Sequence, residues 1–212
     1  MKSENRLTDQ VAAALAGQIL SEKWAPGQKL PSDAVLCETH GVSRTVLREA
    51  LRVLGAKGLI TARPRVGTCV AATDSWSLWD PDVLHWLDAA SPSPETLTPL
   101  LHHAKDMRLA LEPALAALAS SRASQAEKQA LQQSLRDLQN NADCAHEQAF
   151  LQCLYAISGN SFAAYACHMA CWALAHRQTP PPLSGYGALT AAISQGAGVE
   201  ARQSAMTYLI GQ

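Results

Sequence analysis

Three arginines recur at four-residue intervals in one short segment of the chain. Arg44, Arg48 and Arg52 stand at positions i, i+4 and i+8, so a helix places them on one stripe. A neighbouring stripe has the apolar spacing of a core-facing helix, with Leu47, Ala50, Leu51 and Leu54. Guanidinium groups bind phosphates and can donate two hydrogen bonds to guanine O6 and N7. The pattern favours contact with double-stranded DNA; the alternative is a solvated charged face of an ordinary helix.

The start of this segment and a later turn add to the DNA-binding pattern. Ser43 is a suitable N-cap, and Thr45 follows it where unpaired backbone N–H groups favour a phosphate. Arg63 and Arg65 lie in a short turn that ends at Gly67, a residue that permits close approach of the backbone to DNA. These flanking features favour the DNA interpretation over the solvated face.

The elements needed to position these side chains can be placed from breakers and caps. We expect a helix over residues 7–22 with Thr8 as N-cap, and a second over 33–40 between Ser32 and Gly41. A third is expected over 44–57, followed by strands at 59–62 and 68–71. Helix, helix, turn, helix and hairpin within 75 residues predict a winged helix-turn-helix.

Residues 25–71, APGQKLPSDAVLCETHGVSRTVLREALRVLGAKGLITARPRVGTCVA, resemble the DNA-binding domain of the GntR family of bacterial regulators. The resemblance implies that Arg44 and Arg48 contact bases or phosphates and that Gly67 lies at the wing tip. Many relatives have an arginine where this chain has Ala34, which implies a different operator preference. The expected DNA-binding residues are Ser43, Arg44, Thr45, Val46, Arg48, Arg52, Arg63, Arg65 and Gly67.

The charged residues divide the chain into a basic N-terminal part and an acidic C-terminal part. Residues 1–73 carry ten Lys and Arg against six Asp and Glu, a net charge of +4, and residues 74–212 carry a net charge of −5. The sequence shows neither an apolar signal core nor a run long enough to cross a membrane, so we expect a cytoplasmic protein without membrane contact. The six cysteines include no CxxC pair, so a zinc ribbon is not expected.

The sequence predicts a DNA-binding domain at 1–73, a linker at 74–94 and an all-helical domain at 95–212. The linker, rich in Trp and Pro, contains one short helix, 81–90. Its segment DSWSLWDPDVLHWL resembles the corresponding stretch in GntR regulators of sugar-acid catabolism, which implies an aldonate or uronate effector. Beyond it we expect a mostly α fold, with helices at about 95–121, 124–141, 145–158, 161–176, 184–195 and 198–210.

The helical part resembles the FCD effector domain of the same family in three segments: MRLALEPALAALASSRAS, FLQCLYAISGNSF and YGALTAAISQGAGVEARQSAMTYL. The resemblance implies an antiparallel bundle around a cavity, where many members hold a divalent metal through one Asp and three His. The matching positions here are Glu147, Leu151, Tyr186 and Tyr208. Since all three imidazoles are replaced, we expect no metal and no other cofactor. We expect His168 to be packed in the core.

Loss of the metal leaves effector binding possible. By resemblance Arg108 points into the cavity, where a guanidinium can bind a carboxylate through two hydrogen bonds. Tyr186 and Tyr208 could add hydroxyl donors, so the expected effector site is Arg108, Glu147, Leu151, Tyr186 and Tyr208. The alternative is that Leu151 and the two tyrosines fill the cavity and leave a dimerisation domain.

The favoured function is a homodimeric repressor of a bacterial catabolic operon that binds an inverted repeat in double-stranded operator DNA and responds to a small carboxylate. The alternative is a constitutive dimeric DNA-binding regulator whose effector domain has lost metal and ligand binding. An enzyme is not expected, because the sequence has no Gly-rich phosphate loop, no GxSxG and no HExxH.

Overall fold

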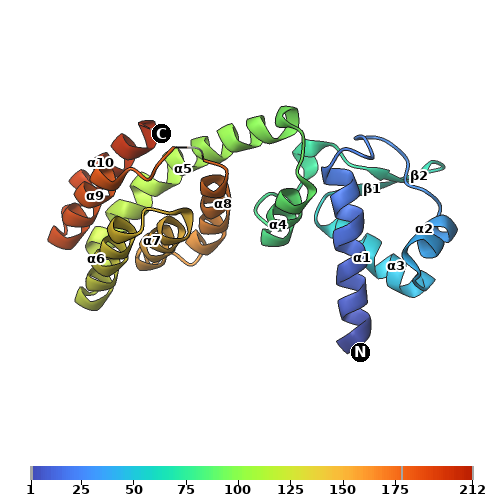
Figure 1. Cartoon of the computed structure of the whole chain (residues 1–212), viewed down its shortest axis with the longest axis horizontal. Coiled ribbons are helices and arrows are strands. Elements are labelled where there is room, and N and C mark those ends of the chain that lie inside the picture. The colour runs from blue at the N-terminus through green and yellow to red at the C-terminus, as the bar shows by residue number, and fades with distance from the viewer. Residues whose placement is uncertain (1, 178, 212) are drawn as a thin grey trace. The chain divides into compact units, whose positions relative to one another are not determined.

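The computed structural model of the chain describes residues 2–177 and 179–211, with side chains from residue 6 onward. It divides into two compact units, Met1–Leu97 and Thr98–Gln212, and each is described by itself. The described elements are mostly helical (Figure 1). None of the helices in the described ranges is both long and apolar enough to cross a membrane.

The first unit begins with three helices and a hairpin. Its helices are α1 (Lys2–Leu20), α2 (Asp33–His40) and α3 (Arg44–Ala56), and its antiparallel strands are β1 (Ile60–Arg63) and β2 (Gly67–Val70). Ile60 pairs with Val70 at one end of the hairpin, and Arg63 pairs with Gly67 at the other. This order is that of a winged helix-turn-helix, as the sequence predicts.

The caps of the two central helices confirm the sequence analysis. The backbone N–H of Val46 donates to Ser43 Oγ over 3.3 Å, and Ser32 caps α2 in the same way. Gly41 ends α2 with a φ of 62°, in the left-handed region. The start of the first helix was predicted wrongly. It begins at Lys2, so Thr8 lies inside α1 and is not its cap, and both strands lie one residue from their expected positions.

The predicted linker belongs to the first unit. The turn η1 (Thr73–Ser75) leads to α4 (Pro81–Ala90), which packs against α1. Lys57 at the end of α3 holds the start of α4, because its Nζ lies 2.5 Å from Asp80 Oδ2 and 2.9 Å from Asp82 Oδ2. Burial lowers the pKa of Lys57, but the two carboxylates outweigh it and leave the pKa raised.

Gly58, between α3 and β1, permits a close approach of its backbone to η1 at Ser75. Its φ is 74°, and a Cβ at this position would lie 1.9 Å from the carbonyl oxygen of Ser75. Only glycine fits here without moving the backbone.

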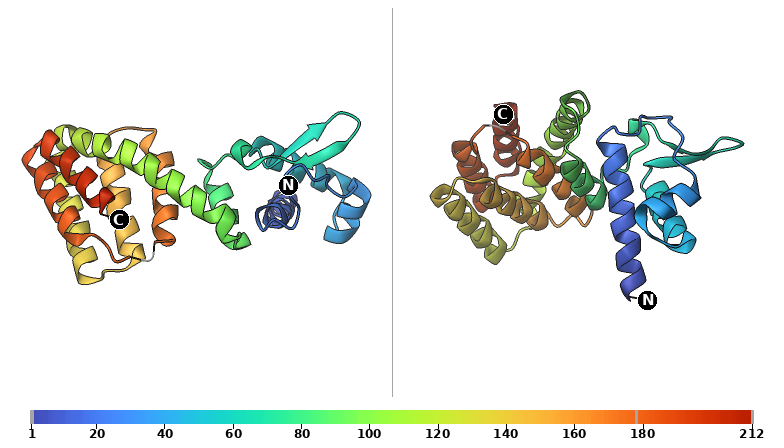
Figure 2. Two further views of the ribbon diagram at one scale, coloured as in Figure 1. Left: turned by 90° about the horizontal axis from the view of Figure 1, so that it is seen from above. Right: turned by 45° about the vertical axis from the view of Figure 1, so that its right-hand side comes forward.

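The second unit is a helical bundle. It comprises most of α5 (Pro94–Arg122), followed by α6 (Gln125–Asn140), α7 (Cys144–Ile157), α8 (Ala163–Ala175), α9 (Leu183–Gln195) and α10 (Gly198–Ile210). Helix α7 packs on both α6 and α8, α9 packs on α10, and α6 also contacts α9 (Figure 2). These helices lie within a residue or two of the predicted ranges. Their shared core includes Phe150, Leu151, Leu154 and Leu189.

Candidate functional site

The three arginines of α3 lie on the surface. Arg44, Arg48 and Arg52 are exposed, while Leu47 and Leu54 on the neighbouring stripe are fully buried. Within the described part of the chain, Arg44 and Arg48 have no acceptor. The Arg52 guanidinium lies 3.7 Å from Glu49, but both side chains are largely exposed, so this pair is weak. The row is therefore available to an external polyanion.

The N-terminus of α3 presents polar groups beside the row. Ser43 and Thr45 are exposed, and Ser43 also caps the helix. Val46 differs from its expected role, because its side chain is buried with 8% exposure and packs inward from α3. Including Val46 among the DNA contacts is therefore corrected: it belongs to the core that holds the helix in place.

The wing adds a second basic surface. Arg63 and Arg65 are exposed, and Arg65 has a φ of 63° at the turn. Gly67 follows with a φ of 111°, and the nearest atom to a Cβ built there is Lys29 Cε at 3.2 Å. Lys29 also forms an isolated antiparallel β-bridge with Cys69 of β2. Lys29 therefore lies against the wing, a position that the sequence analysis missed although the residue stands inside the quoted family motif.

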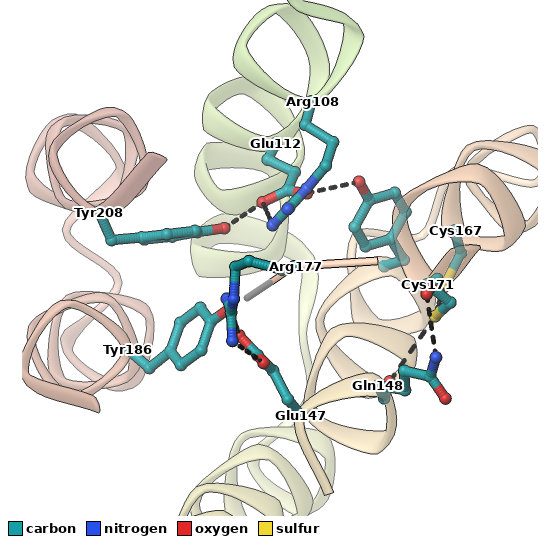
Figure 3. Close-up of polar contacts among 10 residues, drawn as sticks. Arg108, Glu112, Glu147, Gln148, Cys167, Cys171, Arg177, Tyr186 and Tyr208 are labelled. Carbon is teal, nitrogen blue, oxygen red and sulfur yellow. Dashed lines mark hydrogen bonds and ion pairs between the residues drawn. The ribbon is translucent and has the colours of Figure 1, made fainter. Parts of the chain in front are cut away.

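A buried acid on α5 lies within the second unit. Arg108 Nε donates to Glu112 Oε1 over 2.5 Å, and both side chains are buried. The hydroxyl of Tyr155 on α7 donates to the same oxygen over 2.9 Å, and that of Tyr208 on α10 donates to Oε2 (Figure 3). Three donors from three helices thus converge on one carboxylate.

A second buried acid lies on α7. Arg177 binds Glu147 through both terminal nitrogens of its guanidinium, with Nη1 2.7 Å from Oε1. The hydroxyl of Tyr186 on α9 donates to the same Oε1 over 2.6 Å. Arg177 Nε donates to the carbonyl of Thr179 over 2.9 Å, which fixes the plane of the guanidinium. Figure 3 shows this cluster beside the one around Glu112.

The electrostatics of the two clusters raise the pKa of their three tyrosines and of Arg108. Burial raises the pKa of Tyr155, Tyr186 and Tyr208, and the neighbouring glutamates raise it further. Burial alone would lower the pKa of Arg108, but the charge and hydrogen bonds of Glu112 raise it overall. Each glutamate is therefore bound by a cation and by hydroxyl donors.

The structure brings Arg108, Glu147, Tyr186 and Tyr208 to one region of the bundle. The rings of Tyr186 and Tyr208 lie 4.8 Å apart between centroids, and Leu151 is fully buried in the same core. Glu112, Tyr155 and Arg177 were not predicted from the sequence as site residues. Glu112 carried a usable signal, because an Arg and a Glu four residues apart on an otherwise apolar helix face pair readily.

Two expectations about histidine and metal can be compared with the structure. His168 is exposed on α8, so its expected place in the core was wrong. In the described ranges, no group of three His, Cys, Asp or Glu side chains is arranged to hold a metal ion. The absence of a metal cofactor stays a prediction.

Comparisons with known proteins fit both units. The model of bacterial regulatory proteins of the gntR family matches residues 7–70, and that of the FCD domain matches residues 104–209. The galactonate operon transcriptional repressor of Escherichia coli K12 is 30% identical over 220 residues, covering 95% of this chain and 93% of the repressor. The Glc operon transcriptional activator of the same organism is 35% identical over 128 residues, 60% of this chain and 47% of the activator.

Among solved structures, the Streptococcus agalactiae GntR protein superposes with a TM-score of 0.53 at 22% identity, covering 96% of this chain and 97% of that one, which supports the fold. With an exposed arginine row on a winged helix-turn-helix and a helical unit that follows it in sequence, the chain belongs to the GntR family of bacterial regulatory proteins and is a DNA-binding transcription regulator with an FCD domain.

Proposed function

We propose that this regulator is the repressor of a bacterial operon for sugar-acid catabolism. In this proposal a homodimer binds an inverted repeat in the operator, and a small carboxylate releases it. The galactonate repressor, similar over nearly its whole length, supports both the sense of regulation and the effector class. The observation that carries the DNA-binding part is the exposed row of Arg44, Arg48 and Arg52 on α3.

In the proposed complex, α3 enters the major groove with its N-terminus first. Arg44 and Arg48 then reach base edges or phosphates, and Ser43 and Thr45 offer hydroxyl groups to the backbone. The wing arginines and Lys29 lie at a second basic surface suited to the adjacent sugar-phosphate backbone. Arg52, two helical turns from the N-terminus, is placed for a phosphate.

The test of DNA recognition is a titration of operator and scrambled duplexes with Arg48→Ala, and the matched control is Arg136→Ala, at an exposed position of α6. If Arg48 binds a base through two hydrogen bonds, its loss weakens operator binding by about 1–3 kcal/mol and scrambled binding much less. An equal loss of affinity for both duplexes would indicate that Arg48 contacts a phosphate and not a base. Unchanged binding to both would contradict the proposed docking of α3.

For the effector, we propose exchange at Glu147. Glu112 is held by three donors and is fully buried, whereas the side chain of Arg177, the partner of Glu147, keeps 14% of its surface exposed. A ligand carboxylate that displaced Glu147 would receive the same fork of guanidinium donors and the Tyr186 hydroxyl. Arg108, expected from the sequence to bind the ligand, would then hold Glu112 in place.

The test is calorimetry with a panel of aldonates, uronates and dicarboxylates. Arg177→Gln removes the fork and is expected to abolish the binding that the intact protein shows, while Arg122→Gln, at an exposed position at the end of α5, leaves it unchanged. A ligand must also favour one arrangement of the dimer to release DNA, so DNA affinity is measured with and without each acid that binds. Equal binding by Arg177→Gln would exclude exchange at Glu147.

One observation favours a constitutive dimeric regulator as a second candidate. Glu112 and Glu147 already neutralise Arg108 and Arg177, so both buried arginines have a partner without a guest. Under this alternative, no acid in the panel shifts the thermal unfolding of the protein, and operator binding is unaffected by any of them. A reproducible shift with one acid class would exclude it.

A further inference from the structure

A pocket of about 370 Å³, here called the α7–α8 pocket, lies between these two helices. Its volume is at the small end of the range of ligand sites, about 300–1,000 Å³. Arg177 and Tyr186, which bind Glu147, are not part of its wall. The residues that line it are Gln152, Tyr155, Ala156, Asn160, Ser161, Ala164, Cys167, His168 and Cys171.

Small side chains leave the space between the two helices unfilled. On each helix the lining residues recur at intervals of three and four, so each helix contributes one continuous stripe to the wall. Ala156 belongs to the stripe of α7, and Ala164 belongs to that of α8. An alanine leaves open the volume that a leucine or phenylalanine would occupy between packed helices. We therefore attribute the pocket to these two residues.

The buried side of the wall is apolar. Tyr155 and Cys167 are buried, and Cys171 beside them is partly buried. The Sγ atoms of the two cysteines lie 3.9 Å apart, and the Cys171 thiol donates to the backbone carbonyl of Gln148 over 4.0 Å (Figure 3). The hydrogen between the two sulfurs is therefore that of Cys167. Since both thiol hydrogens are used within the protein, the sulfurs offer a ligand an apolar and polarisable surface.

The outer edge of the wall carries hydrogen-bonding groups. Asn160, Ser161 and His168 are exposed, and the side chains of Ser161 and His168 have no hydrogen-bond partner within the described part of the chain. The amide oxygen of Asn160 accepts the backbone N–H of Phe162 over 3.0 Å, which leaves its NH₂ group to donate. A hydroxyl or carbonyl group of a ligand would find partners here.

The charge of the wall selects the class of ligand. No Lys, Arg, Asp or Glu lines the pocket among the residues that the structure describes. An ionised ligand would lose its hydration here without gaining an opposite charge, so the wall favours an uncharged molecule. An aromatic ring gains further contact, because it packs favourably on sulfur and on the ring of Tyr155.

We propose that the α7–α8 pocket binds one small uncharged aromatic molecule that carries a hydroxyl or carbonyl group. Its ring lies against Tyr155 and the sulfurs of Cys167 and Cys171, and its polar group meets the exposed edge. Because Tyr155 also donates to Glu112, a bound ring restrains one of the donors of that buried acid. This site does not depend on the exchange proposed at Glu147, and it would give the regulator a second, neutral input.

The test is a calorimetric titration of the full-length protein with p-cresol, which is uncharged at neutral pH. We expect one molecule bound per chain. Ala156→Leu and Ala164→Leu each fill the pocket from an exposed position, so each should weaken this binding at least about tenfold, or ~1.4 kcal/mol. The matched control is Ala175→Leu, at an exposed position of α8 outside the wall, which should leave the Kd unchanged.

Two analogues test the class of ligand. In 4-hydroxybenzoate a carboxylate replaces the methyl group of p-cresol, and it should displace p-cresol at least about tenfold more weakly because the wall offers no cation. In 4-methylcyclohexanol the ring is saturated, and the loss of its contacts with sulfur and Tyr155 should weaken binding about tenfold.

Folding of each variant is checked by circular dichroism and by operator binding, and the two filling variants lie on different helices, so one suffices if the other does not fold. No binding of p-cresol by the intact protein would overturn the proposal, as would unchanged affinity in a folded filling variant. Equal displacement by 4-hydroxybenzoate would exclude a preference for uncharged ligands. Equal affinity for 4-methylcyclohexanol would exclude a preference for aromatic ones.

Discussion

Tyr208 on the last helix of the second unit donates its hydroxyl hydrogen to Glu112 on α5, 96 residues earlier in the chain. Tyr155 donates to the other oxygen of that carboxylate. A buried carboxyl group costs free energy unless its oxygen atoms accept hydrogen bonds. These hydroxyls therefore stabilise the bundle by solvating Glu112 as water would.

Removal of one of these hydroxyls tests that role. Tyr208→Phe keeps the ring and leaves Glu112 with one donor fewer, so we expect a loss of about 1–3 kcal/mol in the free energy of unfolding of the helical unit. Urea unfolding followed by circular dichroism measures it, and Tyr165→Phe on the exposed side of α8 is the control. A loss no larger than that of the control would show that the hydroxyl carries no such role.

The raised pKa values predict a loss of stability at alkaline pH. In the unfolded chain these tyrosines titrate near the ordinary tyrosine pKa of about 10, whereas in the folded unit the raised pKa of Tyr155, Tyr186 and Tyr208 keeps them protonated to higher pH. Their contribution is fully present below about pH 10 and is lost as the pH rises above it, by up to about 1.4 kcal/mol per pH unit for each tyrosine. Unfolding midpoints between pH 8 and 11.5 test this.

In the same alkaline series, Tyr208→Phe should show a shallower fall, because one of the three titrating groups is gone. Parallel curves for the intact protein and the variant would argue against a raised pKa at Tyr208.

Two glycines close together in sequence should respond oppositely to alanine. Gly58→Ala places a Cβ against the Ser75 carbonyl at a φ of 74°, so we expect at least about 2 kcal/mol of destabilisation. Gly55→Ala lies in α3 with open space around the new methyl group and should stabilise the helix by about 0.5–1 kcal/mol. Thermal unfolding of both variants is the measurement; similar shifts in both would refute the close approach at Gly58.

Lys57 should control the docking of α4. Lys57→Gln removes the cation from Asp80 and Asp82, and we expect faster hydrogen exchange in the α4 amides with only about 1 kcal/mol lost in overall stability, since the pair is partly exposed. Lys23→Gln, on an exposed turn, is the control. Unchanged protection of α4 would show that its apolar face, Val83, Leu84 and Leu87, holds it alone.

Lys29 should act on DNA through charge alone. Lys29→Ala is expected to weaken binding to operator and scrambled duplexes alike, and to reduce the slope of log K against log salt by about 1. Titrations at four salt concentrations measure this slope. A loss confined to the operator would indicate base contact by Lys29, and an unchanged slope would place it off the DNA.

The boundaries of the helices followed from local rules. Ser32, Ser43 and Gly41 are caps whose chemistry acts within four residues, so the sequence alone placed α2 and α3 closely. The start of α1 was predicted wrongly because a threonine can either cap a helix or lie within one of its exposed turns. The residue type at Thr8 therefore does not decide between the two. The exposure of the arginine row also followed from the 3.6-residue period.

The buried acids could not be derived in the same way. Arg177 reaches Glu147 from 30 residues away, and Tyr208 reaches Glu112 from the far end of the bundle, so no spacing in the sequence connects them. Arg108 was expected to face an open cavity. That expectation overlooked Glu112, which lies one helical turn away and binds the Arg108 guanidinium. Long-range partners depend on the packing of whole helices, which local patterns do not encode.

The acids that occupy Arg108 and Arg177 are attached to the same chain as the cations they bind. A free acid must therefore compete with a rival whose effective concentration is millimolar or higher. Short-chain acids that bind through the carboxylate alone would not overcome this competition. A ligand that displaces the internal acid must gain the missing binding free energy from its other groups. The choice among ligands would therefore depend on their hydroxyl groups and length more than on their charge.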